Sequence, residues 1–494
     1  MLYSLNLIIY LIKYYKKIIL KVQKKGGRLK MGINFRFAKK FAAEQILKRA
    51  MNYIEKDPEN NFLKVLDLAD KIAGTERHHE HIQNLKKGFK NNETIREYVR
   101  KFTEFAPSYK KGLVMNFFIN SALLGIPYQY EKAEELGVDV PWTILIDPTS
   151  GCNLNCTGCW AGKYSKSDKL DFETIDRIIQ EAKDLGIYFF VLSGGEPTVY
   201  PRLFDIFEKH DDCGFMMYTN GTLIDEEMAD KMLEVGNVSP AISLEGWKEA
   251  TDERRGEGVF DKVMATMDRL RERGIVFGVS LTATRNNVKE LFSDEYIDFL
   301  VEKGATYAWS FHYVPIGREP NLDLMLTPEQ RAWMAERVPK LRQNKPLFLA
   351  DFWNDGTFTN GCIAGGRRYF HINAKGEVEP CAFVHFAVDN IKEKSLEEVL
   401  QNPLFKEYQK RQPFNENMLM PCPIIDNPEE LREMVKESGA KPTHPGADSL
   451  FDEDIADGLE DLSARWEEKS KPIDKERRKK FNKAKSDPRK ENTQ

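Results

Sequence analysis

The sequence has little of what marks secreted, membrane-spanning or nucleic-acid-binding proteins. Only 7 of its 494 residues are cysteine, too few for the disulfide framework of a secreted protein. Lys and Arg number 73 against 77 Asp and Glu, so no global basic field indicates a nucleic-acid partner. No apolar run reaches the roughly 20 residues of a transmembrane helix. The composition, 41% hydrophobic and 30% charged, is that of a globular protein with room for a large core.

The amino-terminal segment, residues 1–34, is basic. Its first 30 residues contain eight Lys or Arg and no acidic residue. The apolar run Leu5–Ile12 is too short to span a membrane, and no small-residue cleavage site of a signal peptide follows it. Two interpretations remain: a basic amphipathic helix lying on a membrane surface, or an extension upstream of a true start at Met31.

Residues 35–140 have the pattern of several packed helices. Charged and apolar residues recur there with helical periodicity, and the alternation typical of strands is nearly absent. Within this region, Leu113–Leu124 is apolar apart from two asparagines and a serine. We interpret this stretch either as a helix buried against the main domain or as a wall or doorway for an apolar substrate.

Residues 141–346 alternate short apolar runs with amphipathic helical patterns. Six strand–helix units in succession require parallel strands joined by right-handed crossovers. The predicted fold class is therefore α/β, a partial (βα)6 TIM-type barrel with its chemistry at the carboxyl ends of the strands. The predicted strands are Thr143–Asp147, Ile187–Ser193, Gly214–Asn220, Pro240–Glu245, Ile275–Ala283 and Tyr307–Pro315, and the predicted helices are Phe172–Leu185, Pro201–His210, Asp225–Val235, Phe260–Arg273, Asp294–Lys303 and Thr327–Arg342.

The repeat is expected to stop at about Leu347, and two further segments follow. Residues 347–430 carry three cysteines and are expected to form a small module of their own. Residues 431–494 are predicted to be a charged carboxyl-terminal tail. Asp452–Asp461 is acidic and Lys469–Lys490 strongly basic, so we expect the last 25 or so residues to be solvated.

Three cysteines, Cys152, Cys156 and Cys159, share one loop after the first predicted strand. Three thiolates can hold three irons of a [4Fe–4S] cube, and the fourth iron is then open to a small molecule. A zinc site is the alternative, but zinc normally takes a fourth Cys or His nearby, and this loop contains no His. Such clustering also indicates metal ligation in a reducing cytosol.

The spacing and position of these cysteines resemble the radical S-adenosylmethionine (radical SAM) superfamily, over about residues 141–316. In that family the open iron chelates the amino and carboxylate groups of SAM, and reductive cleavage gives a 5′-deoxyadenosyl radical that abstracts hydrogen from unreactive carbon. Gly194, Gly195 and Glu196, followed by Pro197, resemble the family's Gly-Gly-Glu-Pro motif, which contacts the methionyl amino group. Gly158 stands where the family commonly has an aromatic residue, and it can offer only a backbone contact.

Polar residues end the later strands of the predicted barrel. Asn220, and Ser243 with Glu245, resemble family positions near SAM, and Val314 could meet adenine through its backbone. Arg255, at the entrance to the fourth helix, could pair with a carboxylate or form a surface ion pair. Ser280 and Thr282 on the fifth strand are weaker candidates.

A second set of cysteines, Cys362, Cys381 and Cys422, lies in the module at 347–430. The residues on either side of Ala374-Lys375-Gly376 have the pattern of a hairpin. The arrangement resembles the auxiliary-cluster domains of radical SAM enzymes, called twitch and SPASM, although the full SPASM cysteine array is absent. It implies a second [4Fe–4S] cluster, with the fourth iron open or completed by substrate or another side chain; structural thiols are the alternative. Cys213 is predicted to be a buried thiol, and His371 and His385 ordinary polar residues.

The resemblance implies an enzyme that functionalises an inert C–H bond with SAM and a reducing electron donor such as a ferredoxin or flavodoxin. The apolar stretch Leu113–Leu124, Phe352-Trp353 and the basic start favour an apolar or lipid substrate. A peptide-maturation enzyme is the alternative, and a non-catalytic iron–sulfur electron carrier is a third hypothesis. No nucleic-acid partner is expected. The expected location is the cytoplasm, with peripheral contact to the inner face of the membrane left open.

Overall fold

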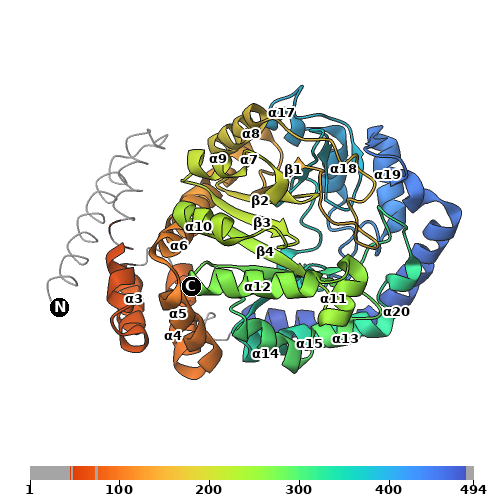
Figure 1. The fold of residues 1–494 in the computed structure, drawn as a ribbon. Coiled ribbons are helices and arrows are strands. Elements are labelled where there is room, and N and C mark those ends of the chain that lie inside the picture. The colour runs from red at the N-terminus through yellow and green to blue at the C-terminus, as the bar shows by residue number, and fades with distance from the viewer. Residues whose placement is uncertain (1–44, 46–47, 73–75, 486–494) are drawn as a thin grey trace.

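The structure is a computed structural model that describes residues 45, 48–72 and 76–485 (Figure 1). The basic segment 1–34, and with it the two interpretations of the amino terminus, lies outside the described residues. None of the described helices combines the length and apolarity needed to cross a membrane.

The described residues ahead of the barrel are helical, as predicted. Tyr109 holds them to the barrel, because its hydroxyl donates a 2.8 Å hydrogen bond to the carbonyl of Val238 and its ring is buried. The neighbouring Ser108 hydroxyl donates to the carbonyl of Leu233 at 2.8 Å. The named helices are α3 (Pro58–Ile72), α4 (Glu76–Asn91), α5 (Glu93–Glu104), α6 (Pro107–Gly112), the π-helix η1 (Leu113–Gly125) and α7 (Ile126–Leu136).

The central sheet confirms the predicted α/β class. Its strand order is β7-β6-β5-β4-β3-β2-β1-β8-β9, and strands β1 to β7 pair in parallel with their neighbours. Six of the seven residues of β1 are buried, as expected for a parallel strand covered on both faces. The strands are β1 (Thr143–Thr149), β2 (Phe189–Gly194), β3 (Gly214–Thr219), β4 (Val238–Leu244), β5 (Gly278–Ala283), β6 (Tyr307–His312) and β7 (Phe348–Asp351).

Helices connect the strands and surround the sheet (Figure 1). Several of them begin at a side-chain cap: Thr327 and Gln330, for example, form a reciprocal capping box at the start of α15. The connecting helices are α8 (Phe172–Asp184), α9 (Leu203–Lys209), α10 (Glu226–Val235), α11 (Lys248–Arg255), α12 (Val259–Glu272), α13 (Val288–Leu291), α14 (Asp294–Glu302) and α15 (Pro328–Asn344), with short 3-10 helices η2 (Pro197–Val199) and η3 (Leu322–Leu324).

Alternation along the strands divides the apolar core in two. Ile144 and Ile146 of β1 pack in the large core that includes the helices, whereas Leu145 belongs to a second apolar cluster with Val191 of β2 and Met216 of β3. Successive strand residues point to opposite faces. The second cluster therefore lies on the inner side of the barrel, next to the carboxyl-terminal module.

The parallel sheet extends past residue 347, where the repeat was expected to stop. Strand β7 pairs with β6, and Tyr307 lies opposite Phe348. This strand has only four residues, too few for a clear periodic signal. The helix that precedes it, α15, is the sixth that the sequence predicts.

The carboxyl-terminal module is attached to the barrel through the same sheet. Its strand β8 pairs in parallel with β1 and in antiparallel with β9, so the predicted hairpin around Lys375 is confirmed. Its elements are α16 (Gly356–Thr359), β8 (His371–Ile372), β9 (Val378–Glu379), β10 (Phe386–Ala387), α17 (Leu396–Leu400), α18 (Pro403–Arg411), α19 (Pro428–Ser438), β11 (Lys441–Pro442) and η4 (Ala447–Phe451).

The described end of the segment predicted to be a charged tail is a packed helix, and Ser470, in the part expected to be solvated, is fully buried. Helix α20 (Glu453–Lys485) contacts α15. Trp466 is 1% exposed, donates its Nε1 hydrogen to the carbonyl of Leu419 at 2.9 Å, and carries the Arg331 guanidinium 4.3 Å from its ring centre. The prediction followed the high charge of the segment and missed the apolar residues Leu459, Leu462 and Trp466, which recur at helical spacing.

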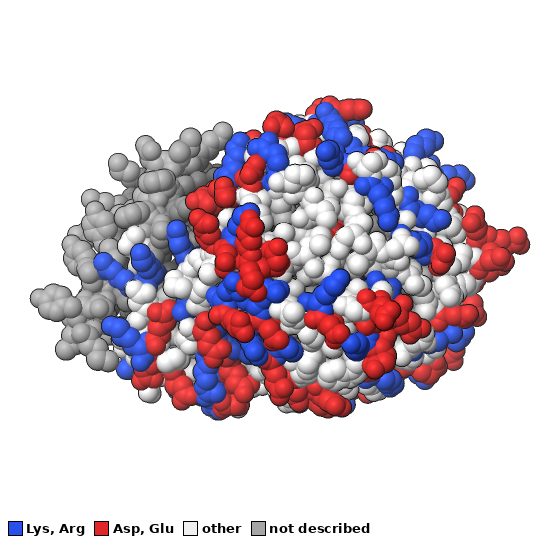
Figure 2. Space-filling view, viewed as in Figure 1, with Lys and Arg blue, Asp and Glu red and all other residues white. Residues whose placement is uncertain are grey.

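The surface is mixed in charge. On the face shown in Figure 2, Lys and Arg side chains lie beside Asp and Glu, without a broad basic field. Many of them form ion pairs, such as Arg273 with Glu226 and Asp230. This face therefore agrees with the nearly balanced composition.

Candidate active site

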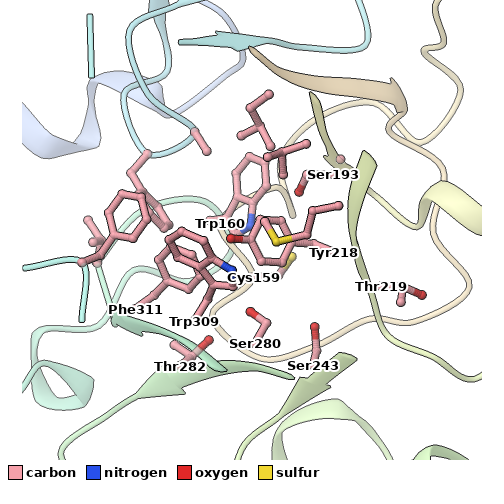
Figure 3. Close-up of a pocket in the computed structure, with 18 of the residues that line it drawn as sticks. Cys159, Trp160, Ser193, Tyr218, Thr219, Ser243, Ser280, Thr282, Trp309 and Phe311 are labelled. Atoms are coloured by element: carbon pink, nitrogen blue, oxygen red, sulfur yellow. The ribbon is translucent and has the colours of Figure 1, made fainter. Parts of the chain in front are cut away.

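A cavity of about 250 Å³ opens inside the barrel at the carboxyl ends of the strands. It brings the three-cysteine loop together with residues from β2, β3, β4 and the loop after β6; Figure 3 shows side chains of this lining, among them Cys159, Ser193 and Ser243. Of the predicted site residues, the lining includes Cys152, Cys156, Gly158, Cys159, Gly194, Gly195, Asn220, Ser243, Arg255, Ser280, Thr282 and Val314.

Two arginines fix the cysteine loop to the rest of the barrel. Arg318, after β6, donates its backbone hydrogen to the carbonyl of Cys159 at 3.0 Å and its side chain to that of Cys156 at 2.9 Å. Arg254, on α11, accepts at its carbonyl from Thr157 at 2.9 Å. The loop thus has its conformation set by backbone groups, which leaves the cysteine sulfurs available.

Gly194 and Gly195 hold the start of the same loop. The backbone N–H of Gly195 donates to Thr149 at 2.9 Å, and that of Glu196 donates to the carbonyl of Gly151 at 2.8 Å. Gly194 has a φ of 107°, and a Cβ added at Gly195 would overlap the carbonyl oxygens of Gly151 and Ser150. Only glycines permit this approach of two backbones.

Glu196 is placed differently from its glycine neighbours. It does not line the cavity, and its side chain is 1% exposed. Its carboxylate accepts hydrogen bonds from the hydroxyls of Thr198 and Thr219 at 2.7 Å, and from the backbone N–H of Asn220 at 2.7 Å. Burial raises the pKa of this carboxyl, while the same hydrogen bonds oppose the rise. In this structure Glu196 fixes the end of β3 and, through it, Asn220.

Tyr313 lies where a side chain at position 158 would extend. Gly158 has a φ of 62°, and a Cβ built there would lie 2.8 Å from the Tyr313 ring. Tyr313 follows β6, is 3% exposed and lines the cavity. An aromatic ring therefore borders the loop beside the third cysteine, and it comes from the residue that follows β6, far away in the sequence. The sequence pattern around Gly158 gives no signal for it.

Arg255 lies beside the cavity with its side chain 12% exposed, and it pairs with the buried Glu245. Its Nε and one terminal nitrogen donate to Glu245 Oε1 at 2.9 and 2.6 Å, and Arg254 lies 2.6 Å from the same oxygen. Burial alone would lower the pKa of Arg255, but Glu245 outweighs it and the pKa is raised. The pairing of Arg255 with a carboxylate is therefore confirmed, and it involves a buried glutamate and two arginines on the cavity wall.

Aromatic side chains form much of the rest of the cavity wall. Trp309 and Phe311, two residues apart on β6, both face the cavity. Tyr218 extends from β3, and Phe352 and Phe383 come from the carboxyl-terminal module. Phe311 contacts Tyr218, Phe352 and Phe383 with ring centres 5.1 to 6.0 Å apart. The inward positions of β6 follow from strand alternation, whereas the contribution of the later module requires the fold.

The apolar stretch Leu113–Leu124 forms η1 and lies against the barrel. Of its two interpretations, this agrees with a helix packed on the main domain. Phe117 contacts Trp142 and Phe189 edge to face, at 5.7 and 5.4 Å. Trp142 also donates its Nε1 hydrogen to Ser121 at 2.9 Å. Trp142 and Phe189 line the cavity, but no residue of η1 does. The helix therefore supports the cavity wall from behind.

A second cavity, also of about 250 Å³, is lined by Cys362, Cys381 and Cys422. Cys362 follows α16, Cys381 follows β9 and Cys422 precedes α19. Burial raises the pKa of Cys381 to about 12 and that of Cys422 further. Trp309, Phe352, Ile363, Tyr369 and Phe383 line both cavities, so a single layer of side chains separates them.

Both cysteine sets suit a [4Fe–4S] group by their donor chemistry. Soft thiolates favour such clusters, and hydrogen bonds to the sulfurs tune them. The backbone N–H two residues after each cysteine donates to its sulfur, at 3.4 Å for Cys152, 3.5 Å for Cys362, 3.5 Å for Cys381 and 3.4 Å for Cys422. Within the described residues, no three His, Cys, Asp or Glu side chains lie close enough together to hold a single metal ion. Cys213 is fully buried in the core, as predicted.

A buried ion-pair triad joins the barrel to the carboxyl-terminal module. His371 on β8 lies 2.9 Å from Asp147 on β1 and 2.7 Å from Glu379 on β9. Burial by itself would lower the pKa of His371, but the two carboxylates raise it to about 10. The ring of Trp160, from the cysteine loop, lies 5.8 Å from the imidazole. The sequence indicated only an ordinary polar residue at this position.

Comparison with known proteins agrees with this geometry. Residues 146–290 match the model of the Radical SAM superfamily, and residues 362–423 that of the SPASM iron–sulfur cluster-binding domain. The AdoMet-dependent heme synthase of Methanosarcina barkeri is 26% identical over 293 residues, 53% of this chain and 83% of that one. The mycofactocin maturase MftC of Mycobacterium tuberculosis is 28% identical over 282 residues, 54% of this chain and 71% of that one.

A solved structure shares the fold. Streptococcus suis SuiB bound to S-adenosylmethionine superposes with a TM-score of 0.50 at 16% identity, over 76% of this chain and 84% of that one. The two domain matches imply SAM, a [4Fe–4S] cluster and additional iron–sulfur cluster binding. The chain therefore contains a Radical SAM superfamily domain and, carboxyl-terminal to it, a SPASM iron–sulfur cluster-binding domain.

Proposed function

We propose that this enzyme removes hydrogen from an unactivated C–H bond of an apolar substrate. A cluster held by Cys152, Cys156 and Cys159, together with SAM, would supply a 5′-deoxyadenosyl radical on reduction. The observation that carries the proposal is the single cavity that borders the cysteine loop on one side and an aromatic wall on the other.

The residues around the cysteine loop are suited to hold SAM. Backbone groups of Gly194 and Gly195 lie beside the loop, and the side chains of Asn220 and Ser243 come from the ends of β3 and β4. Asn220 is held in place, since its side chain donates to Asn153 at 2.8 Å. Arg255 places a cationic group on the same wall, where it can attract the carboxylate of an amino acid.

The aromatic wall gives the substrate side of the cavity its character. Trp309, Phe311 and Phe352 present apolar faces, and they keep water from a reactive centre. Pockets of this kind bind apolar ligands through burial, with a few polar groups to orient them. The wall therefore favours an apolar substrate positioned between the SAM residues and the SPASM domain.

Relatives support two substrate classes. One relative is a heme synthase, and a flat macrocycle such as heme would fit against the aromatic wall. The maturase relative supports the alternative, a peptide substrate. A strand-containing peptide-binding module ahead of the barrel would favour that alternative, whereas the described residues at 48–136 are helical. We therefore place the apolar substrate first.

The second cysteine set would hold an auxiliary cluster in the SPASM domain. Cys362, Cys381 and Cys422 lie on the far side of the shared layer of side chains. A cluster on them could exchange electrons with the first cavity through that layer. A reducing partner such as a ferredoxin or flavodoxin would supply the electron for SAM cleavage. Exposed cubes are attacked by oxygen, so we propose a reducing cytoplasmic setting, with any membrane contact peripheral.

The test is an anaerobic assay of the full chain. After reconstitution with iron and sulfide and reduction by dithionite, the protein should form 5′-deoxyadenosine from SAM. Deuterated lipid, tetrapyrrole and peptide pools are then supplied in turn, and mass spectrometry follows deuterium into 5′-deoxyadenosine. No 5′-deoxyadenosine from iron-loaded protein would refute the radical SAM activity. Deuterium transfer from the peptide pool alone would refute the apolar substrate.

A further inference from the structure

The second cavity contains a tyrosine that the proposed function leaves unused. Tyr408, on α18, lines this cavity together with Cys362, Cys381 and Cys422. Its side chain is 0% exposed, and its hydroxyl has no hydrogen-bond partner. A buried hydroxyl without a partner costs about 1–3 kcal/mol. A fold that keeps one in this place implies that something else satisfies it.

The other oxygen-bearing side chains on this cavity wall are already engaged. Asp355 accepts from both terminal nitrogens of Arg342, and Asp351 accepts from the side chain of Asn354 at 2.8 Å. The hydroxyl of Thr359 donates to Gly361 at 2.8 Å. Among the described residues of the lining, Tyr408 thus carries the one side-chain oxygen without a partner.

Tyr369, the second tyrosine of the wall, has its partner already. Its hydroxyl donates to the sulfur of Cys381 at 2.8 Å. The two phenols therefore differ: the hydroxyl of Tyr369 is hydrogen-bonded to a cysteine, whereas the hydroxyl of Tyr408 has no hydrogen-bond partner. Trp353, also on the wall, has an unpartnered Nε1–H, but that group is a donor without a lone pair and cannot bind metal.

The ring of Tyr408 is held rigidly. A Cβ added at Gly365 would overlap it, so the backbone at Gly365 lies directly against the ring. Phe414 packs edge to face at 5.5 Å. The phenol therefore cannot turn away from the cavity without disturbing its neighbours, and the position of its oxygen is set before any ligand binds.

We propose that Tyr408 supplies the fourth protein ligand of the auxiliary cluster, through its phenolate oxygen. This inference rests on the proposed function, since it requires a cluster on the three cysteines. A cube has four irons, and three cysteines leave one without a protein ligand. Ligation breaks the phenol O–H bond and forms an iron–oxygen bond; the proton leaves to solvent and no electron is transferred. The SPASM site is then closed, in contrast to the open iron that the first cysteine loop leaves.

The test uses a parent in which the first cluster cannot form, Cys152→Ala with Cys156→Ala and Cys159→Ala. Reconstituted anaerobically, this chain should bind about four irons, and resonance Raman spectra should contain an iron–phenolate vibration. Tyr408→Phe should abolish that vibration, and on mild oxidation it should convert to a three-iron form more readily than the parent. Tyr369→Phe, the matched control, should keep the vibration and change only the reduction potential, because it loses a hydrogen bond to sulfur.

The outcomes separate the two proposals. A four-iron parent without the phenolate vibration, or a vibration that survives in Tyr408→Phe, would overturn the ligand assignment and leave the proposed auxiliary cluster in place. A parent that folds by circular dichroism but binds no iron would overturn both. Because the parent spectrum is itself decisive, a Tyr408→Phe chain that fails to fold does not prevent the test.

Discussion

The two cysteine sites use the chain in opposite ways. In the barrel, Cys152, Cys156 and Cys159 fall within eight residues of one loop, and hydrogen bonds between the loop backbone and Arg318 and Arg254 hold that loop. In the SPASM domain the three cysteines come from separate segments between residues 362 and 422. A ligand set on one loop can be recognised from spacing alone, whereas a distributed set exists only once its segments have folded together.

The manner of support differs as well. Glycines bring the first loop close to the end of β2, so its geometry depends on backbone approach. The second site depends on packing, since Tyr408 and Tyr369 are buried around its cysteines. We therefore expect the first site to be sensitive to small backbone changes, and the second to changes in its side-chain wall.

The largest expected effect separates the chemical roles of the two sites. Cys156→Ala should lower 5′-deoxyadenosine formation at least ~10³-fold, beyond the roughly 10–100-fold loss typical of a residue that only supports a ligand. Iron should fall from about eight to about four per chain, the equivalent of one cube. Cys213→Ala is the control, because Cys213 lines neither cavity. Unchanged SAM cleavage in Cys156→Ala would refute the ligand assignment.

The corresponding change in the SPASM domain should give a different result. Cys422→Ala should also remove about four irons per chain, yet 5′-deoxyadenosine formation should stay within about tenfold of wild type, because the cysteine loop and its anchors are untouched. Product formation from the substrate should fall much further. The informative measurement is the ratio of product to 5′-deoxyadenosine. If cleavage and product fall in parallel, the two sites do not have separate roles.

The sequence predicts the barrel well because its repeat is regular. All six predicted strands are present, and Gly194 and Gly195 lie beside the cysteine loop as the strand order requires. What the sequence could not give are contacts between distant segments. Tyr313 against Gly158, and Phe383 in the cavity wall, depend on how loops and domains meet.

Charge misled the prediction in two places. The basic end of the chain was expected to be solvated, but Ser470 is fully buried there and Ile473 packs against Trp466. His371 was expected to be an ordinary polar residue. The carboxylates that surround it lie on β1 and β9, so the residues next to it in the sequence give no sign of the triad. Net charge and composition report on solvation in general, and they do not show which charges a fold will bury in pairs.

A smaller effect should follow from a backbone change at the first site alone. Gly195→Ala should displace the cysteine loop, at a cost of about 1–3 kcal/mol for overpacking, and weaken SAM binding roughly tenfold. The auxiliary iron should be retained. Gly439→Ala is the control: a Cβ there meets no atom within 4 Å, and its φ of 69° adds a left-handed strain that Gly195→Ala lacks, so a greater loss at Gly195 reflects the backbone approach. Calorimetric titration with SAM measures the difference, and equal affinities in the two variants would show that the backbone approach at Gly195 is dispensable.

A pH-dependent effect on stability, with no loss of iron, is expected of the triad that joins the two regions. The pKa of His371 is raised to about 10 from an ordinary value of 6.5, so its contribution to stability is complete below about pH 6.5 and is lost as the pH rises through 10. The loss should be on the order of 2–4 kcal/mol. The urea midpoint of the wild type should fall between pH 7 and 10, and that of His371→Gln should begin lower and fall less. Parallel curves would mean that the charge on His371 does not stabilise the junction. A steeper wild-type curve would show that barrel and SPASM domain, although they hold their cysteines in different ways, share one electrostatic contact that both need.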